Sequence, residues 1–160
     1  MDKKVINFVT ATNTSFKAID HPTFHSLLAP QQIKDESHYR KQILPDVYKQ
    51  VRKKIKNELE ECEWLSFTTD AWSGPSNNFL CLTAHGIASN WVKENRVLAV
   101  CEFPGSHTGQ EIAKLLDKII SEWQIGDEKI HCFVTDSAAN MKAVDIVFCF
   151  KLFDLIVGIF

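Results

Sequence analysis

Two aspartates stand where acidic side chains could do chemistry. Asp70 follows the apolar and β-branched run 64–69, and Asp136 follows the similar run 129–135. Each comes where a predicted strand gives way to a loop, and open α/β sheets bind ligands at the carboxyl ends of their strands. If the two strands are adjacent and parallel, the two carboxylates meet at one edge of the sheet.

Two neighbouring carboxylates repel each other unless one is protonated or a cation joins them. Hard oxygen ligands suit Mg²⁺ or Mn²⁺, and metal ions held in this way activate water and stabilise the leaving oxygen in phosphoryl transfer. The alternative is that each aspartate caps the following turn or helix through backbone N–H groups. The spacing of Asp70 and Asp136 leaves both interpretations open.

The strands that must position these aspartates follow from the hydrophobic pattern. Alternation of apolar and polar residues, rich in aromatic and β-branched types, predicts strands over 64–70, 79–88, 91–103 and 129–135. The 79–88 segment is apolar on both faces, which indicates a central strand covered on both sides. Ser89 and Asn90 predict a tight hairpin turn.

Helical periodicity appears before and between these strands. Apolar residues recur every four positions over 37–62, and we expect a break at Pro45 because proline lacks a backbone donor. Thr108 with Glu111 fits a capping box that opens an amphipathic helix, and Gly126 is expected to end it.

Composition limits the classes of protein that fit. A chain of 160 residues with 18 basic and 20 acidic side chains has room for one domain and a net charge of −2. This balance excludes a uniformly cationic DNA coat, because phosphate binding needs a cationic surplus, although a local basic patch remains compatible. The N-terminus lacks the apolar region of a secretory signal.

The five cysteines form no C-x-x-C pair, so we expect reduced thiols and no zinc in this chain. The segment 144–160 is apolar but short and interrupted by charges, so we expect no membrane span. It is interpreted as a core strand or helix, or as an alternative end to a longer chain.

Four segments in order make the sequence resemble the hAT transposase family, and most closely the domesticated BED-type zinc-finger proteins. They are FTTDAWS at 67–73, LTAH at 82–85, FPGSHTG at 103–109 and TDSAANM at 135–141, preceded by RKQILPDVY at 40–48. The resemblance implies an α/β fold of RNase H-like type. Its mixed sheet would have three antiparallel strands, a helix and a parallel strand, preceded by an N-terminal helix and incomplete at the C-terminus.

The resemblance also implies a DDE triad that holds two divalent metals for DNA strand cleavage and transfer. Asp70 matches the first acidic position and Asp136 the second. The third, a downstream glutamate, has no match within these residues, and neither do the family's Cys-x-x-His segment and BED finger. We therefore expect Asp70 and Asp136 to be vestigial catalytic and metal-binding candidates that hold Mg²⁺ or Mn²⁺ weakly.

These features favour a transposase-derived nuclear protein without strand-transfer activity, acting through DNA or protein binding. One alternative is an active DDE-type nuclease in which Asp145 or Asp154 replaces the missing glutamate. Another is a non-functional truncated fragment, which the change of pattern after residue 143 suggests. Exposed apolar surface would favour a protein partner or a homodimer, and no membrane is expected as a partner.

We expect four segments along the chain: an N-terminal arm (1–36), a helical lead-in (37–63), a partial RNase H-like domain (64–143) and a divergent apolar tail (144–160). Two aromatic residues of the matched segments have simple interpretations. His85 shares a strand face with Phe79 and Cys81 and is predicted to be a core histidine, and Trp72 is predicted to pack over the sheet edge rather than stack on a base.

Overall fold

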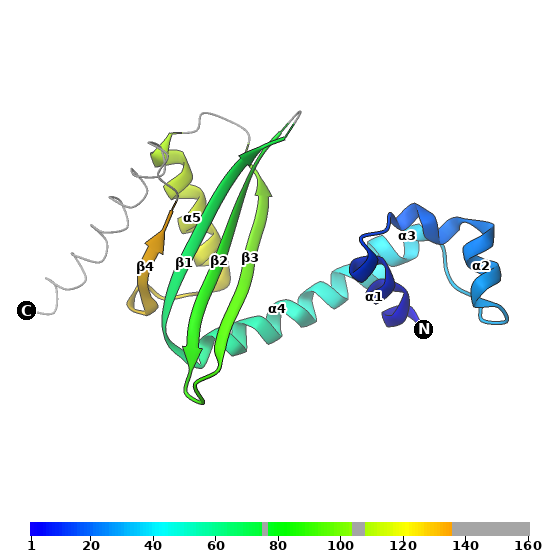
Figure 1. Ribbon diagram of the computed structural model, residues 1–160, viewed down its shortest axis with the longest axis horizontal. Coiled ribbons are helices and arrows are strands. Elements are labelled where there is room, and N and C mark those ends of the chain that lie inside the picture. Colours follow the sequence, from blue (N-terminus) through cyan, green and yellow to red (C-terminus); the bar gives the residue numbers. More distant parts are fainter. Residues whose placement is uncertain (75–76, 104–107, 136–160) are drawn as a thin grey trace, which may run out of the picture. The chain divides into compact units, whose positions relative to one another are not determined.

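The computed structural model describes residues 1–74, 77–103 and 108–135 (Figure 1). The chain divides into two compact units, Met1–Lys54 and Ile55–Phe160, which are described one at a time. The tail predicted at 144–160 and the candidate ligand Asp136 lie outside the described residues. In the described part of the chain, no helix combines the length and the hydropathy that crossing a bilayer requires.

The first unit is helical and has its own small core. Its elements are α1 (Asp2–Thr12), η1 (Phe16–Asp20), α2 (Pro22–Leu28), α3 (Glu36–His38), the π-helical turn η2 (Tyr39–Ile43) and the start of α4 (Leu44–Glu60). Its buried residues are Val5, Ile6, Val9, Ile19, Ile33 and Tyr39. The apolar residues on one side of α1, Val5, Ile6 and Val9, pack with Tyr39 in this core.

Pro45 does not interrupt a helix, because it lies in the first turn of α4, where a missing backbone donor is tolerated. The π-helical turn η2 comes immediately before it, and Leu44 N–H closes that turn onto the Tyr39 carbonyl. The helical backbone thus continues past Pro45, and instead of the expected break there is a local widening of the helix just upstream of the proline.

The second unit contains a four-stranded sheet in the order β3-β2-β1-β4. Its elements are β1 (Cys62–Ser73), β2 (Asn78–Ala88), β3 (Lys93–Glu102), α5 (Gly109–Trp123), η3 (Asp127–Lys129) and β4 (Ile130–Val134). The pairs β1–β2 and β2–β3 are antiparallel, whereas β4 joins β1 in parallel. The sheet is thus mixed, and α5 comes between β3 and β4 in the sequence. Both features confirm the expected RNase H-like arrangement.

Helix α5 begins and ends through local capping. The Thr108 side chain accepts a hydrogen bond from Glu111 N–H at 3.4 Å, which confirms the predicted cap. The helix ends earlier than predicted, because Gln124 adopts the left-handed conformation (φ 57°) and closes the last turn. Gly126 instead precedes η3.

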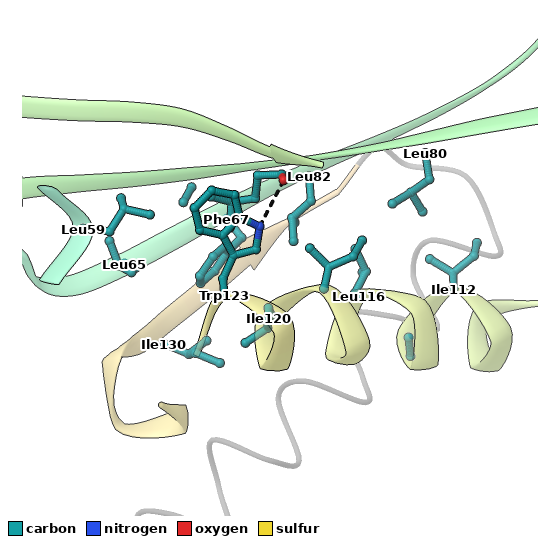
Figure 2. Packing of buried hydrophobic residues seen from close by; sticks show 14 of the residues in the cluster. Leu59, Leu65, Phe67, Leu80, Leu82, Ile112, Leu116, Ile120, Trp123 and Ile130 are labelled. Atoms are coloured by element: carbon teal, nitrogen blue, oxygen red, sulfur yellow. Dashed lines mark hydrogen bonds between the residues drawn. The ribbon is translucent and has the colours of Figure 1, made fainter. Parts of the chain in front are cut away.

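The core of the second unit lies between α5 and one face of the sheet (Figure 2). Phe67, Leu80 and Leu82 point from the strands toward Leu116 and Ile120 of α5. The Trp123 indole N–H donates to the Leu98 carbonyl at 3.0 Å, where Leu98 is the extra residue of a bulge in β3. We call this covered side the core face.

The opposite side of the sheet, here called the open face, differs from the sequence prediction. It carries the alternate residues of each strand, which are half-buried or exposed: Ser66, Thr68, Asp70, Trp72, Phe79, Cys81, Thr83, His85, Ile87, Lys93, Asn95, Val97, Val100 and Glu102. The prediction that both faces of 79–88 are covered is therefore wrong for the described residues, in which α5 covers one face. Phe79, Cys81 and Ile87 do share a face, as predicted.

Candidate functional site

Asp70 lies on the open face with an exposed side chain, but it is inside β1, which runs on to Ser73. The prediction that the strand gives way to a loop at Asp70 is therefore wrong. The neighbouring Thr69 points the other way, is buried, and donates its hydroxyl hydrogen to the Cys81 carbonyl at 3.0 Å. The alternation of a strand therefore turns the Asp70 carboxylate outward while Thr69 anchors the backbone beside it. An exposed, hard oxygen ligand in this position suits Mg²⁺ or Mn²⁺.

The strand that leads to Asp136 lies directly beside β1. Thr68 is the register partner of Val134, and Phe67 is the partner of Phe133, whose ring stacks on that of Phe67 with centroids 5.0 Å apart. The expectation that the first and fourth strands are parallel neighbours is confirmed. Asp136 is outside the described residues, so its separation from Asp70 stays a prediction.

Trp72 packs at the same end of the sheet as Asp70. Its ring stacks on Phe79 of β2 with a centroid separation of 5.6 Å and an interplanar angle of 22°. Trp72 is still 44% exposed, so the stacked pair is partly open to solvent. It lies two residues beyond Asp70 along β1. The predicted packing role is thus observed.

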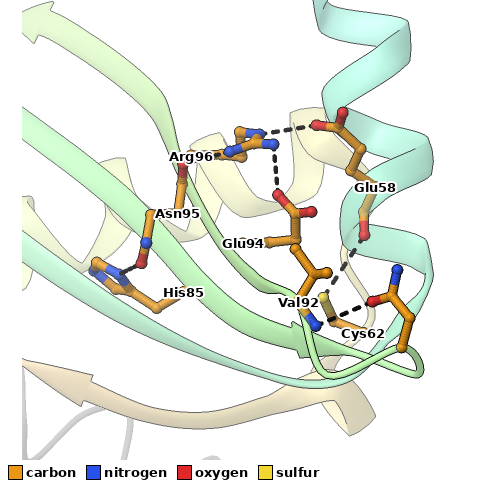
Figure 3. Close-up of polar contacts among 8 residues, drawn as sticks. Glu58, Cys62, His85, Val92, Glu94, Asn95 and Arg96 are labelled. Atoms are coloured by element: carbon orange, nitrogen blue, oxygen red, sulfur yellow. Dashed lines mark hydrogen bonds and ion pairs between the residues drawn. The ribbon is translucent and has the colours of Figure 1, made fainter.

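His85 is not a core histidine but the centre of a polar relay across three strands. Its Nε2 lies 2.8 Å from Thr68 Oγ1 of β1, and its Nδ1 lies 2.7 Å from Asn95 Oδ1 of β3. Figure 3 shows the contact with Asn95. The amide oxygen can only accept, so Nδ1 carries a hydrogen and donates it to Asn95, and in the tautomer with hydrogen on Nδ1 alone, Nε2 accepts from the Thr68 hydroxyl. Sequence reasoning missed Asn95, whose only signal was its strand alternation.

A cluster of charged side chains, Glu58, Glu94 and Arg96, lies at the end of the sheet where β3 begins (Figure 3). Arg96 of β3 donates to Glu58 of α4 at 2.8 Å and pairs with Glu94 at 2.5 Å. The hydrogen bond to Glu58 is the main cause that raises the pKa of the Arg96 guanidinium. Since each carboxylate already has a cation, this cluster ties α4 to the sheet rather than offering an open ligand site.

The end of α4 is held by a lysine from a distant part of the chain. The Lys129 ammonium donates to the Glu60 carbonyl at 2.8 Å, an acceptor left over at the end of α4, and to the carbonyl of Cys62, the first residue of β1, at 3.0 Å. Burial raises the pKa of the neighbouring Cys62 thiol, and the charge of Glu94 adds to this effect. Cys62 is therefore a neutral, packed thiol.

Among the residues that the structure describes, no group of three or more His, Cys, Asp or Glu side chains is arranged to hold a metal ion. Asp70 is opposite Cys81 in the register, and the hydrogen-bonded side chains of Thr68, His85 and Asn95 lie further along the same face. A cation at Asp70 would need a further carboxylate, and Asp136 is the candidate that the sequence offers.

Comparisons with known proteins agree with the topology. Residues 68–150 match the family model of the ZBED1 RNase-like domain. The chain is 28% identical over 135 residues to the "Putative AC transposase" of Zea mays. The aligned residues are 81% of this chain and 17% of the transposase. It is also 24% identical over 145 residues to the "Putative transcriptional regulator tpeD" of Talaromyces stipitatus. That alignment includes 86% of this chain and 17% of the regulator. The chain thus spans about a sixth of the length of these relatives.

Proposed function

The chain belongs to the ZBED1 RNase-like domain family and is hAT-transposase-like, and from this premise we propose that it binds a divalent metal ion and DNA in the nucleus without transferring DNA strands by itself. Asp70 and Asp136 are the proposed metal ligands. Carboxylates of this kind hold Mg²⁺ or Mn²⁺, which when bound would supply an electrophile for phosphate oxygens.

The parallel register of β1 and β4 is the observation that carries this proposal. Thr68 pairs with Val134, and Asp70 and Asp136 each follow two residues later. Neighbouring strands lie about 4.8 Å apart, so an unbroken register would set the two carboxylates beside each other. The exposed Asp70 side chain on the open face is in the orientation that such a shared site requires.

The surrounding residues of this chain hold the site without taking part in its chemistry. Thr69 fixes the β1 backbone through Cys81, and the stacked Trp72 and Phe79 rings shield the end of the sheet from water on one side. No third carboxylate joins Asp70 within the described residues. Two ligands hold a metal weakly, which is why we propose binding without strand transfer.

A basic segment on α4 supports a DNA-binding role. Five cationic side chains lie within 49–56, namely Lys49, Arg52, Lys53, Lys54 and Lys56. Lys49 forms an exposed within-helix ion pair with Asp46, and such exposed pairs are worth little and are easily exchanged for phosphate. Lys56 is half-buried and is also bonded to Glu60 and to the Gln124 side chain. The transposase and regulator relatives are the source of the nuclear assignment.

Mn²⁺ titration followed by electron paramagnetic resonance tests the metal site. Asp70→Asn and Asp136→Asn should each weaken Mn²⁺ binding at least about tenfold, because each removes one of two charged ligands. Asp127→Asn, an exposed carboxylate in η3, is the matched control and should bind like the parent chain. Equal affinity in all four chains would refute the site.

The same samples, mixed with labelled hairpin-ended DNA in Mn²⁺, test the rest of the proposal. We expect binding that weakens with salt and no cut product. Metal-dependent cutting that is lost in Asp70→Asn would replace this proposal with an active nuclease. If the chain does not bind DNA even at low salt, the DNA-binding role is refuted. The conclusion about the metal site does not depend on this result.

A further inference from the structure

The β2–β3 hairpin ends in an exposed tryptophan held at a fixed position. Trp91 N–H donates to the Ala88 carbonyl and Ala88 N–H to the Val92 carbonyl, both at 2.9 Å, and the Asn90 side chain accepts from Val92 N–H at 3.0 Å. These bonds define a three-residue loop rather than the two-residue turn predicted at Ser89 and Asn90. Trp91 is 86% exposed.

The backbone of Trp91 makes this exposure unusual. Its φ of 64° lies in the left-handed region, which a three-residue hairpin needs at this position and usually fills with glycine. A bulky side chain there is strained. The tip thus carries a residue that is unfavourable for the turn and that contributes almost nothing to the core of its own unit.

A cavity in the first unit has complementary properties. It has a volume of about 300 Å³ and an almost entirely apolar lining, formed by Met1, Lys4, Val5, Phe8, Phe24, Leu27 and Leu28 of α1 and α2. Leu27 is 76% exposed, and the rings of Phe8 and Phe24 meet at a centroid separation of 5.5 Å. An apolar cavity of about 150 Å³ holds a benzene molecule, so this one has room for a bicyclic indole.

We propose that the chain associates with a second copy by inserting Trp91 of one copy into the α1–α2 cavity of the other. The partner is a second copy because this chain carries both complementary features, an exposed rigid indole and an open apolar cavity large enough for it. Lys4 is the one charged residue of the lining and would meet the indole ring face as a cation.

The contact joins different surfaces of the two copies. Such a contact either closes reciprocally, with each indole in the cavity of the other copy, or leaves one indole and one cavity unused so that further copies can add. In both forms association depends on Trp91 and on the cavity, which separates this contact from a face-to-face pairing of two open sheet faces.

Sedimentation over a concentration series of the full chain tests the contact. Trp91→Gly removes the indole and relieves the positive φ, so the variant should lose association at least tenfold while melting at the same or a higher temperature. Leu27→Lys places a charge at the rim of the cavity and should weaken association similarly. The controls Tyr48→Ser and Val51→Lys change exposed apolar residues of α4 and should associate like the parent.

Mixing the two variants gives the decisive measurement. Trp91→Gly keeps an intact cavity and Leu27→Lys keeps an intact indole, so the mixture should form one-to-one complexes although each variant alone stays monomeric. A monomeric parent chain, association unaffected by Trp91→Gly, or a mixture without complexes would each overturn the proposal. A parent whose association is unaffected by both Trp91→Gly and Leu27→Lys would point to the open sheet face instead.

Discussion

The core face and the open face of the sheet are formed by alternate residues of the same strands, but they have different roles. On the core face, Phe67, Leu80 and Leu82 are fully buried against α5. On the open face, one residue further along each strand, Thr68, Cys81 and Thr83 are half-buried or exposed. Successive residues of a strand point to opposite faces. In β1 and β2, the residues that stabilise the fold therefore alternate with the residues that are available for chemistry.

The largest effect should come from the core face. Leu82→Ala should lower the free energy of unfolding by about 2–5 kcal/mol, because it leaves a cavity between β2 and α5. Thr83→Ala, the next residue on the open face, should change it by no more than about 0.5 kcal/mol. Urea unfolding measures both, and equal losses would contradict the division between the faces.

The bond between Trp123 and the β3 bulge should rank second. Trp123→Phe leaves the Leu98 carbonyl without its buried donor, which should cost about 1–3 kcal/mol. Trp64→Phe alters an exposed tryptophan of β1 and serves as the control. A loss for Trp123→Phe no larger than the control's would show that the bulge satisfies its carbonyl in another way.

The polar relay on the open face should contribute less. His85→Ala removes two hydrogen bonds in a half-buried setting, with an expected loss of about 1 kcal/mol. His85→Gln can keep one donor and one acceptor and should recover part of it. Nitrogen-15 shifts of the parent imidazole should show hydrogen on Nδ1, and hydrogen on Nε2 would reverse the assigned direction of the relay.

Alkaline pH should produce the smallest change. Burial raises the pKa of Cys62 and Cys101, so the folded chain keeps both thiol protons at a pH where the unfolded chain loses them. Stability is therefore highest below the usual thiol pKa of about 8.5 and falls as the pH rises above it. The double variant Cys62→Ala and Cys101→Ala should show a shallower fall between about pH 8.5 and 10 in urea unfolding.

Cys132→Ala controls for the loss of a thiol as such. The fall in stability of this variant with pH is compared with that of the double variant. A double variant whose pH dependence equals the parent's would show that neither Cys62 nor Cys101 ionises on unfolding in this range.

Short-range sequence signals predicted much of the second unit. Alternation placed the four strands to within a few residues, and Thr108 with Glu111 placed the start of α5. The first unit was missed because α1 has only three buried residues, Val5, Ile6 and Val9, too few to stand out as a stripe. The end of α5 was misplaced because Gln124 can adopt the left-handed conformation that was expected of Gly126.

The amino-acid sequence by itself determined which segments extend or coil, because this depends on side-chain period and local caps. Only the tertiary structure decided which residues meet. Lys129 caps a helix 69 residues away at Glu60, Asn95 orients His85 from another strand, and β4 aligns Val134 with Thr68. Such pairings depend on register and topology, which local periodicity does not encode.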